Sequence, residues 1–308
     1  MFGYVIQRLL WTVPVLLAVA AITFALMHAV PGGPWDRSKQ LPPQALDNVN
    51  HAYGLDRPLY EQFGDYLLGL AQGDLGVSFR NQNRPVSDIL SDGLRVSATL
   101  GLLALALSVA VGVSLGVAAA LWRNSAIDYA TVVFATAAAS LPSFILGMLL
   151  LVLFTAKLHW LPSGGWGSPE QAVMPVVALS ALPAAYIARV TRASMLDVLE
   201  QDYVRTARAK GLRERAVVLR HMLRNALIPV LTVIGPLAAM LVTGSFIVEE
   251  VFAIPGIGRA FVTSISARDY GVIMGTTLLY TSIVVIANLA VDLLYAIVNP
   301  RIRYETYG

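Results

Sequence analysis

Six apolar runs, each long enough to cross a lipid bilayer, constrain the fold of this chain more than any other feature. A spanning helix needs about 20 mostly apolar residues, since the hydrocarbon core is about 30 Å thick and a helix rises about 1.5 Å per residue. Within lipid, a helix satisfies its backbone hydrogen bonds inside its own segment. We therefore expect an all-α integral membrane protein whose six spans cover residues 9–30, 97–122, 129–156, 172–188, 226–248 and 272–298.

Composition supports the membrane class and excludes others. Hydrophobic residues make up 56% of the 308 residues and charged residues only 13%, which is too apolar for an ordinary soluble domain or a disordered chain. The chain has no Cys, so it has no disulfide framework, no thiolate metal site and no Cys nucleophile. The net charge of +3 reflects basic residues gathered on one side of the membrane, and we expect no nucleic-acid partner.

The distribution of charge predicts which loops face the cytosol. Nine of the 22 Lys and Arg residues fall between Arg189 and Arg224, and basic loops between spans stay on the cytoplasmic side. The stretch from 31 to 94 is acidic in balance, so we expect it outside, with a short helix over residues 60–70. Both termini then lie in the cytosol. The predicted domains are an anchor plus extracytoplasmic segment at 1–94, a transmembrane domain at 95–300 and a cytosolic tail at 301–308.

The first apolar run carries a small-residue pattern and a histidine, and each has two interpretations. Ala18, Val19 and Ala20 fit the cleavage site of a signal peptide, but apolar residues continue beyond them, which favours an uncleaved anchor. His28 is the one ionisable side chain deep in this run. A histidine at the end of a helix, near the membrane interface, is the favoured interpretation over an ion-coupling site.

A long basic stretch, residues 202–229, predicts two helices separated by a glycine. Four apolar or small residues recur at the three- and four-residue steps of an amphipathic helix: Leu196, Leu199, Tyr203 and Ala207. Gly211 ends this helix, because glycine adopts the left-handed cap conformation without a steric penalty, and a second helical pattern starts at Arg213. This stretch would present a rigid basic docking surface to the cytosol. From composition alone, a solvated loop or a helix lying on anionic lipid stays open.

The second apolar run carries a ladder of small residues at every fourth position: Ala104, Ser108, Gly112, Gly116 and Ala120. In lipid, close packing drives helices together, so such a ladder lets another helix approach to backbone contact. Alanine-rich helices produce ladders by chance. The two glycines nevertheless favour a tight crossing at Ser108, Gly112 and Gly116, within this subunit or with a partner.

Prolines lie inside the third, fourth and fifth predicted spans: Pro142 in the third, Pro175 and Pro183 in the fourth, and Pro229 and Pro236 in the fifth. A proline inside a span kinks the helix and frees carbonyl groups. Kinks of this kind are tolerated where helices line a cavity or bend during gating.

The chain lacks the residues with which a transporter powers itself. Spans two, three and five hold no acidic or basic side chain, and the sixth holds only Asp292, whereas ion-coupled carriers place such groups inside the membrane. None of the three Lys residues lies in a GxxxxGK[ST] phosphate loop. We also find no metal site and no reactive cluster for an intramembrane enzyme, and we expect a non-catalytic chain. A secondary carrier stays open as the alternative; if ATP is the energy source, another polypeptide hydrolyses it.

Several stretches resemble one family of transport proteins. RTARAKGL at 205–212 resembles the cytoplasmic loop motif of ABC importer permeases, although the usual Glu-Ala-Ala start is replaced by Arg205, Thr206 and Ala207, and Pro229 lies farther from Gly211 than usual. This form, followed by RNALIP, is similar to the peptide-transporting branch. Five further stretches resemble the B-type permease subunit of dipeptide and oligopeptide importers: RLLWTVPVLLAVAAITFALMHAVPGGP, YGLDRPLYEQF, GDLGVSF, SLPSFILGMLLLVLF and TGSFIVEEVFAIPGIGR.

The resemblance implies a type I ABC importer permease fold and one half of a two-permease channel in a prokaryotic cytoplasmic membrane. It implies a heterodimer with a related second permease, two cytosolic ATPase subunits or domains that bind ATP and Mg, and an extracytoplasmic substrate-binding protein. Lipid surrounds the chain, which binds no cofactor itself. The implied substrate is a dipeptide or oligopeptide, with nickel or haem as same-branch alternatives. The residues implied to couple to the ATPase are Tyr203, Arg205, Thr206, Ala207, Ala209, Lys210, Gly211 and Leu212.

A second functional segment follows the fifth span, where proline and glycine from Ile254 to Gly258 are expected to prevent a helix. Irregular chain at the membrane surface is stable only if it packs on protein. Together with the resemblance, this favours an outer gate beneath the binding protein; a plain helical hairpin with an acidic cap is the alternative. The candidate gate residues are Glu249, Glu250, Phe252, Ile254, Pro255 and Gly256.

Overall fold

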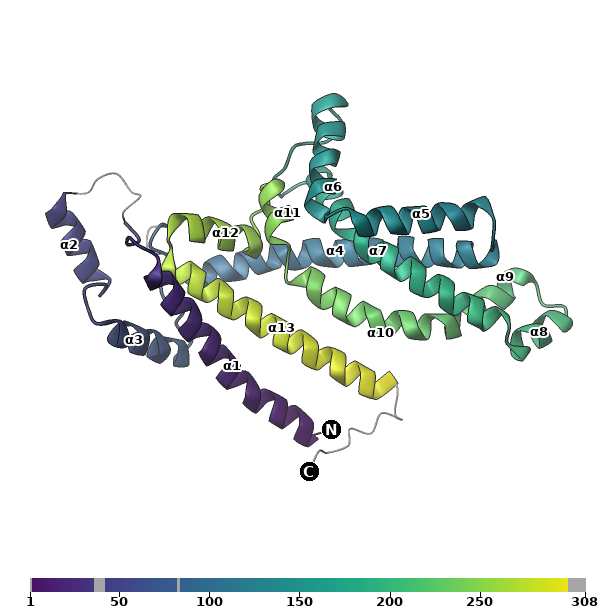
Figure 1. The fold of residues 1–308 in the computed structure, drawn as a ribbon, viewed down its shortest axis with the longest axis horizontal. Coiled ribbons are helices and arrows are strands. Elements are labelled where there is room, and N and C mark those ends of the chain that lie inside the picture. Colours follow the sequence, from purple (N-terminus) through teal and green to yellow (C-terminus); the bar gives the residue numbers. More distant parts are fainter. Residues whose placement is uncertain (1, 36–41, 82–83, 299–308) are drawn as a thin grey trace. The chain divides into compact units, whose positions relative to one another are not determined.

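A computed structural model describes residues 2–35, 42–81 and 84–298 of the chain (Figure 1). The predicted tail at 301–308 lies outside the described residues. Within them, every regular element is helical, and an isolated bridge pairs Val77 with Pro85. The prediction of an all-α chain is therefore confirmed.

The helices follow one another along the whole chain. Their bounds are α1 Phe2–Ala29, α2 Pro43–Ala52, α3 Leu59–Ala71, α4 Val86–Leu121, α5 Ala126–Ser140, α6 Ser143–Leu150, η1 Leu151–Lys157, α7 Pro169–Leu199, α8 Asp202–Ala209, α9 Glu214–Ala216, η2 Val217–Met222, α10 Leu223–Val242, α11 Phe246–Val251, α12 Ile257–Ala267 and α13 Tyr270–Val298; η1 and η2 are π-helical turns.

Five stretches among the described residues are long and apolar enough to cross a membrane as single helices: Leu10–Ala29, Val86–Leu121, Pro169–Leu199, Glu214–Val242 and Tyr270–Leu289. The pair formed by α5 and α6–η1 makes a sixth if it is taken as one broken span. The helices at the expected fourth and fifth spans have other bounds. Pro169–Leu199 extends beyond residues 172–188 at both ends, whereas Glu214–Val242 begins before residue 226 and ends before residue 248.

The third predicted span is not one continuous helix. The chain bends by 103° between the two halves of this span, Ala126–Ser140 and Ser143–Lys157. Leu141 has extended backbone angles (φ −101°, ψ 119°), as expected for a residue that precedes a proline, and Pro142 then starts α6 as its N-cap. Pro142 therefore ends one helix and begins another within residues 129–156, and the two helices pass together as one broken span by length and composition.

Contacts divide the chain into two compact units. Unit 1 contains residues 1–97 and 255–286, and unit 2 contains residues 98–254 and 287–308. The chain therefore leaves unit 1 within α4 and returns to it after Ile254. The sequence predicted a division into consecutive segments and did not predict this return.

In unit 1, helix α3 packs on α1 and α13. Phe63, Tyr66 and Leu70 of α3 lie against a buried cluster that includes Ala20 and Met274. The short helix predicted over residues 60–70 is therefore present as α3. Close by, Arg80 donates to the carbonyl oxygens of Ala267 (2.9 Å) and Pro34 (2.7 Å), and the Ser78 hydroxyl bonds to Asp269.

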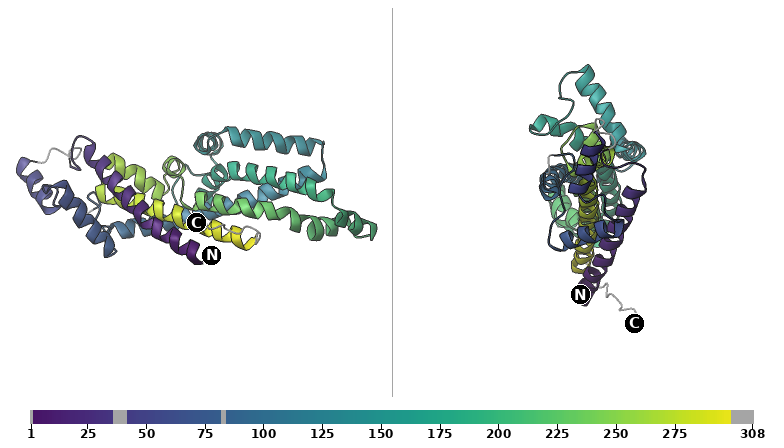
Figure 2. Two further views of the ribbon diagram at one scale, coloured as in Figure 1. Left: turned by 60° about the horizontal axis from the view of Figure 1, so that its bottom comes forward. Right: turned by 90° about the vertical axis from the view of Figure 1, so that its left-hand side faces the viewer.

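Unit 2 is built around α7, against which α5, α6 and α10 pack (Figure 2). Helix α4 meets α7 along the ladder of small residues. A Cβ atom on Gly112 would lie 2.7 Å from the Ala184 carbonyl oxygen, and one on Gly116 would lie 2.6 Å from that of Ala188. The buried Ser108 hydroxyl bonds to the Ser180 carbonyl oxygen at 3.1 Å. The structure thus places this face of α4 in backbone contact with α7.

Candidate functional site

Helix α8 is held by its inner face. Val204 and Ala207, three residues apart, are buried in a cluster with Met195 of α7 and with Val217 and Met222 of η2. Residues three apart lie on the same side of a helix, so the rest of α8 is turned outward. We refer to residues 202–216, from α8 to α9, as the α8 loop.

A hydrogen-bonded cap ends α8. The Gly211 amide donates to the Arg208 carbonyl oxygen (2.9 Å), and the Leu212 amide donates to that of Ala207 (3.4 Å). This pair of bonds is the Schellman motif, which places its turning residue in the left-handed region. Gly211 has φ +77°, which glycine adopts without the strain that a Cβ would cause. The glycine break predicted at Gly211 therefore corresponds to a defined backbone geometry.

Side-chain bonds across the turn hold the α8 loop together. Arg208 donates two hydrogen bonds to Glu214, from Nε to Oε2 at 3.2 Å and from Nη2 to Oε1 at 2.6 Å. These bonds to the carboxylate raise the pKa of Arg208. Asn225 donates to the Tyr203 hydroxyl at 3.0 Å. Neither pair was found by the sequence analysis, because the partners of each lie in different helices. The opposite charges of Arg208 and Glu214 on either side of Gly211 were the one available signal.

Most of the predicted coupling residues lie on the outer face of the α8 loop. Tyr203 and Leu212 are 40% and 43% exposed, and five others are also exposed: Arg205, Thr206, Ala209, Lys210 and Gly211. Ala207 differs. It is buried in the cluster with Met195 and Met222, so it does not lie on the exposed face with the other implied coupling residues.

The amphipathic helix expected to run from Leu196 through Ala207 is two helices. Helix α7 ends at Leu199 and α8 begins at Asp202. Gln201 separates them with extended backbone angles (φ −74°, ψ 144°), and its carbonyl oxygen accepts the amides of Val204 and Arg205. The apolar periodicity continues through this break because residues on both helices contact the same buried cluster.

The α11 segment, residues 246–256, contains the predicted gate residues. Glu249, Phe252 and Ile254 are fully buried, whereas Glu250 and Pro255 are exposed. The helical break is present from Phe252 to Gly256, but α12 begins directly at Ile257. The helix that ends at Val251 is therefore not continued, and Ile257 and Gly258 begin a new helix for which Gly256 is the N-cap.

Two glycines hold Phe252 by close packing. A Cβ on Gly147 of α6 would lie 2.9 Å from the Phe252 ring, and one on Gly164 would lie 2.2 Å from the Phe252 carbonyl oxygen. That oxygen accepts a hydrogen bond from the Gly165 amide at 2.8 Å. Phe252 is thus fixed in unit 2 by contacts that no larger residue at Gly147 or Gly164 would permit.

A buried ion pair joins α5 to α7 in unit 2. Arg192 forms two bonds with Asp128, Nε to Oδ1 at 2.6 Å and Nη2 to Oδ2 at 2.8 Å. The Asn124 amide donates to the same carboxylate at 3.0 Å. No local sequence pattern indicates this pair, since the partners lie 64 residues apart.

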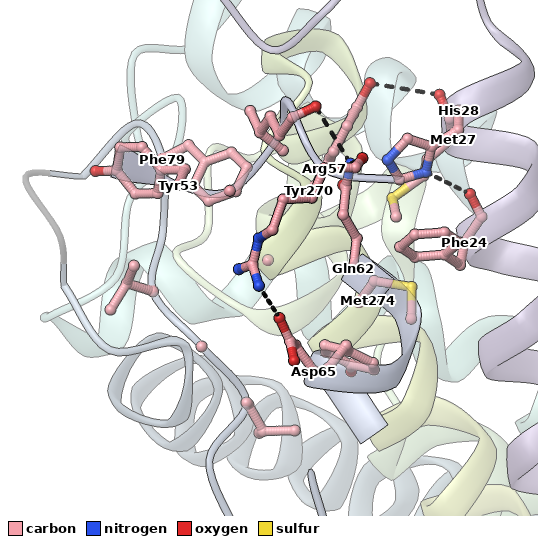
Figure 3. A pocket seen from close by; sticks show the side chains of 17 residues that line it. Phe24, Met27, His28, Tyr53, Arg57, Gln62, Asp65, Phe79, Tyr270 and Met274 are labelled. Carbon is pink, nitrogen blue, oxygen red and sulfur yellow. Dashed lines mark hydrogen bonds and ion pairs between the residues drawn. The ribbon is translucent and has the colours of Figure 1, made fainter. Parts of the chain in front are cut away.

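Unit 1 contains a cavity of about 180 Å³ lined by α1, α3 and α13 (Figure 3). His28 packs between Phe24 and Tyr270, and its Nδ1 donates to the Phe24 carbonyl oxygen at 2.8 Å. Arg57 and Asp65 form an ion pair of 2.7 Å, and burial raises the pKa of Tyr66 to about 12. His28 therefore has a packing role at the end of α1.

Across residues 2–35, 42–81 and 84–298, no group of three or more His, Asp or Glu side chains could hold a metal.

The comparison with known proteins decides the family. Residues 112–304 match the model of the binding-protein-dependent transport system inner membrane component, and residues 1–102 match that of its N-terminal part. The chain is 43% identical to the dipeptide transport system permease protein DppB of Bacillus subtilis. The alignment spans 308 residues and covers all of both chains. It is 41% identical over 306 residues to the oligopeptide transport system permease protein OppB of Escherichia coli K12, covering 99% of this chain and 100% of the relative. This chain belongs to that inner-membrane permease family.

The permease also shares its fold with a solved importer. The inward-facing MetNI methionine ABC transporter matches with a TM-score of 0.55 and 21% identity, over 68% of this chain and 96% of the other. The permease is thus a non-catalytic, multi-pass inner-membrane subunit with the type I ABC importer fold. As a permease of an ABC importer, it is expected to work with ATPase partners.

Proposed function

We propose that this permease takes dipeptides or oligopeptides across the cytoplasmic membrane as half of an ATP-driven import channel. The observation that carries the proposal is the likeness over the full length of the chain to permeases named for dipeptide and oligopeptide transport. Both relatives are named for peptides, which favours this substrate class over nickel and haem.

The α8 loop is the proposed docking site for the ATPase. Its capped turn and its Arg208–Glu214 pair make it stiff, and its outer face exposes Arg205 and Lys210. ATP and Mg would bind to two ATPase subunits or domains in the cytosol. A related second permease and an extracytoplasmic binding protein would complete the importer, and the α11 segment would be the outer gate. Both termini of this chain would lie in the cytosol.

Uptake by the complete importer tests the substrate class. The permease is reconstituted in vesicles with its second permease, ATPases and binding protein, and ATP-dependent uptake of labelled alanyl-alanine, tetra-alanine, nickel and haem is compared. We expect uptake of at least one peptide, to be competed by excess unlabelled peptide. Uptake of nickel or haem alone would overturn the peptide assignment and leave the permease assignment in place.

Cysteine labelling tests the docking site and the orientation. Because the chain has no native Cys, single substitutions at Tyr60 and Arg213, both exposed, can be labelled without background. A reagent that cannot cross the membrane should reach Tyr60→Cys in intact cells and Arg213→Cys only in inverted vesicles. Adding the ATPase should protect Arg213→Cys. The reverse accessibility would contradict the orientation, and equal labelling with and without the ATPase would contradict docking at this loop.

A further inference from the structure

We propose that the buried Asp128–Arg192 pair is a positioning element that makes α5 follow α7, so that movement of the α8 loop reaches Phe252 through the bent helix pair α5 and α6. The inference rests on the proposed docking of an ATPase at the α8 loop. Every contact in this route lies in unit 2.

The geometry of the pair suits a rigid connection. The planar guanidinium of Arg192 meets both carboxylate oxygens, an arrangement that fixes orientation as well as distance. The Asp128 side chain is only 4% exposed and that of Arg192 is 28% exposed, so water competes little for these bonds. Removal of Arg192 would leave the buried Asp128 carboxylate without its charged partner, and this cost opposes separation of the pair.

Arg192 is also tied to its surroundings on the α4 side. Gly116 of α4 lies so close to α7 that a Cβ there would be 2.6 Å from the Thr191 Cβ and 3.0 Å from the Arg192 backbone nitrogen. The backbone that carries Arg192 is therefore packed against α4 while its side chain holds α5. Three helices meet at this point.

From Arg192 toward the α8 loop, the connection is the end of α7. Met195 and Val198 of α7 lie in the same buried cluster as Val204 and Ala207 of α8. A displacement of α8 by a partner would therefore act on the last turns of α7, close to Arg192.

From Asp128 toward the α11 segment, the connection is α5 and α6. Helix α5 runs from Ala126 to Ser140, turns by 103° at Leu141 and Pro142, and continues as α6. Gly147 of α6 then contacts the Phe252 ring directly. The bend converts a shift of α5 along its axis into a sideways shift of α6 against this ring.

Helix α7 offers a second route to the same place. The Ala178 Cβ would lie 3.8 Å from a Cβ on Gly147, so α7 reaches α6 without the ion pair. The two routes make different predictions, because only the first depends on the charges of Asp128 and Arg192.

The first experiment uses the reconstituted importer with Ile254→Cys as a reporter, since Ile254 is fully buried and reacts only if the segment opens. With ATP trapped by vanadate, we expect labelling by an impermeant maleimide to rise about tenfold in the otherwise native chain, as trapping shifts the population of open states. Asp128→Asn or Arg192→Gln should reduce that rise to less than about twofold while ATP hydrolysis stays within about twofold of native. The double variant should lose no more than either single one, because the partners act as a unit.

The matched control is Asp92→Asn, which removes the partner of Arg84 from an exposed ion pair in unit 1 and should leave the labelling response unchanged. A full nucleotide-dependent rise in Asp128→Asn would overturn the inference and assign the route to α7 alone. An unchanged labelling rate in the otherwise native chain would also overturn it, since the α11 segment would then not open. If the ATPase does not protect Arg213→Cys from labelling in the otherwise native chain, that result would instead contradict the proposed docking of the ATPase at the α8 loop.

A second experiment does not depend on charge variants that could fail to assemble. Spin labels at Tyr129→Cys on α5 and Asp197→Cys on α7, both exposed positions, report whether the two helices move together. We expect one narrow distance distribution that trapped ATP leaves unchanged. A distance that changes on trapping would show that α5 does not follow α7 and would overturn the inference.

Discussion

The α8 loop and the α11 segment both interrupt a helical path with a hydrogen-bonded turn, but the surroundings of the two turns differ. The α8 loop is exposed, and its turn is fixed by backbone hydrogen bonds and by the Arg208–Glu214 pair. In the α11 segment, the amides of Ala253 and Ile254 close an equivalent turn, but Phe252 and Ile254 are buried, and Phe252 is packed against Gly147 and Gly164. Hydrogen bonds and charges on a surface leave a loop free to bind a partner, whereas close packing leaves no room for change without a cost in stability.

This difference predicts which kind of defect a substitution causes. Changes in the α11 segment should lower the stability of the permease, because they act on packed contacts. Changes in the α8 loop should spare stability and act on coupling or on partner binding. Three substitutions test this contrast, from the largest expected effect to the smallest.

Gly164→Ala should have the largest effect on stability. Its Cβ would lie 2.2 Å from the Phe252 carbonyl oxygen, a backbone atom that cannot rotate away. We expect a loss of about 3 kcal/mol in the free energy of unfolding, as for severe overpacking, measured by thermal or denaturant unfolding of the purified permease. Gly64→Ala is the control, since nothing lies within 4 Å of its Cβ position in α3, and it should be neutral or stabilising by about 0.5–1 kcal/mol. Equal stability of Gly164→Ala and native protein would contradict the close packing of Phe252.

Gly211→Val should have a smaller effect on stability and a large effect on coupling. A branched residue at φ +77° is strained by about 1–2 kcal/mol, and the Schellman bonds of α8 would weaken. In the reconstituted importer, we expect peptide uptake per ATP hydrolysed to fall about tenfold, while the permease still inserts. Gly211→Asn is the matched control, because Asn tolerates the left-handed region, and it should retain most of the coupling. Normal uptake by Gly211→Val with the ATPase bound would show that the turn geometry does not matter.

Arg208→Gln should have the smallest effect on stability. Both side chains of the Arg208–Glu214 pair are about half exposed, and surface pairs of this kind contribute about 0.2–1 kcal/mol. The expected consequence is a looser α8 loop and a modest loss of ATPase affinity, measured by co-purification over a range of salt concentrations. Lys210→Gln, which leaves the pair intact, should lower ATPase affinity at low salt and have less effect at high salt. A loss of several kcal/mol in stability for Arg208→Gln would mean that the loop is part of the packed core.

The sequence predicted features that depend on local chemistry. The helix-glycine-helix pattern around Gly211 and the apolar periodicity of the spans each follow from residues close together in the chain. The bend at Pro142 could have been predicted, because a proline disfavours the helical conformation of the residue before it, here Leu141. Pro175 and Pro183, however, lie inside the continuous helix α7. A proline alone therefore does not decide between a break and an uninterrupted helix; Pro175 and Pro183 are buried within unit 2, where neighbouring helices support α7.

Features that depend on distant residues were not predicted. Asp128 and Arg192 meet across two helices, and burial of Ala207 depends on η2, which follows it in the chain. Spacing in one sequence carries no signal for such contacts. The same holds for the return of residues 255–286 to unit 1.

That return has a consequence for how the permease is made. As the chain emerges from the ribosome, residues 1–97 enter the membrane and its surface long before residues 255–286 exist. Ser78 and Arg80 must therefore remain without Asp269 and Ala267 until residues 98–254 of unit 2 have been synthesised. The two parts of unit 1 are thus separated in synthesis by residues 98–254, so a nascent permease that stalls within that stretch would display an N-terminal part whose partners in residues 255–286 do not yet exist.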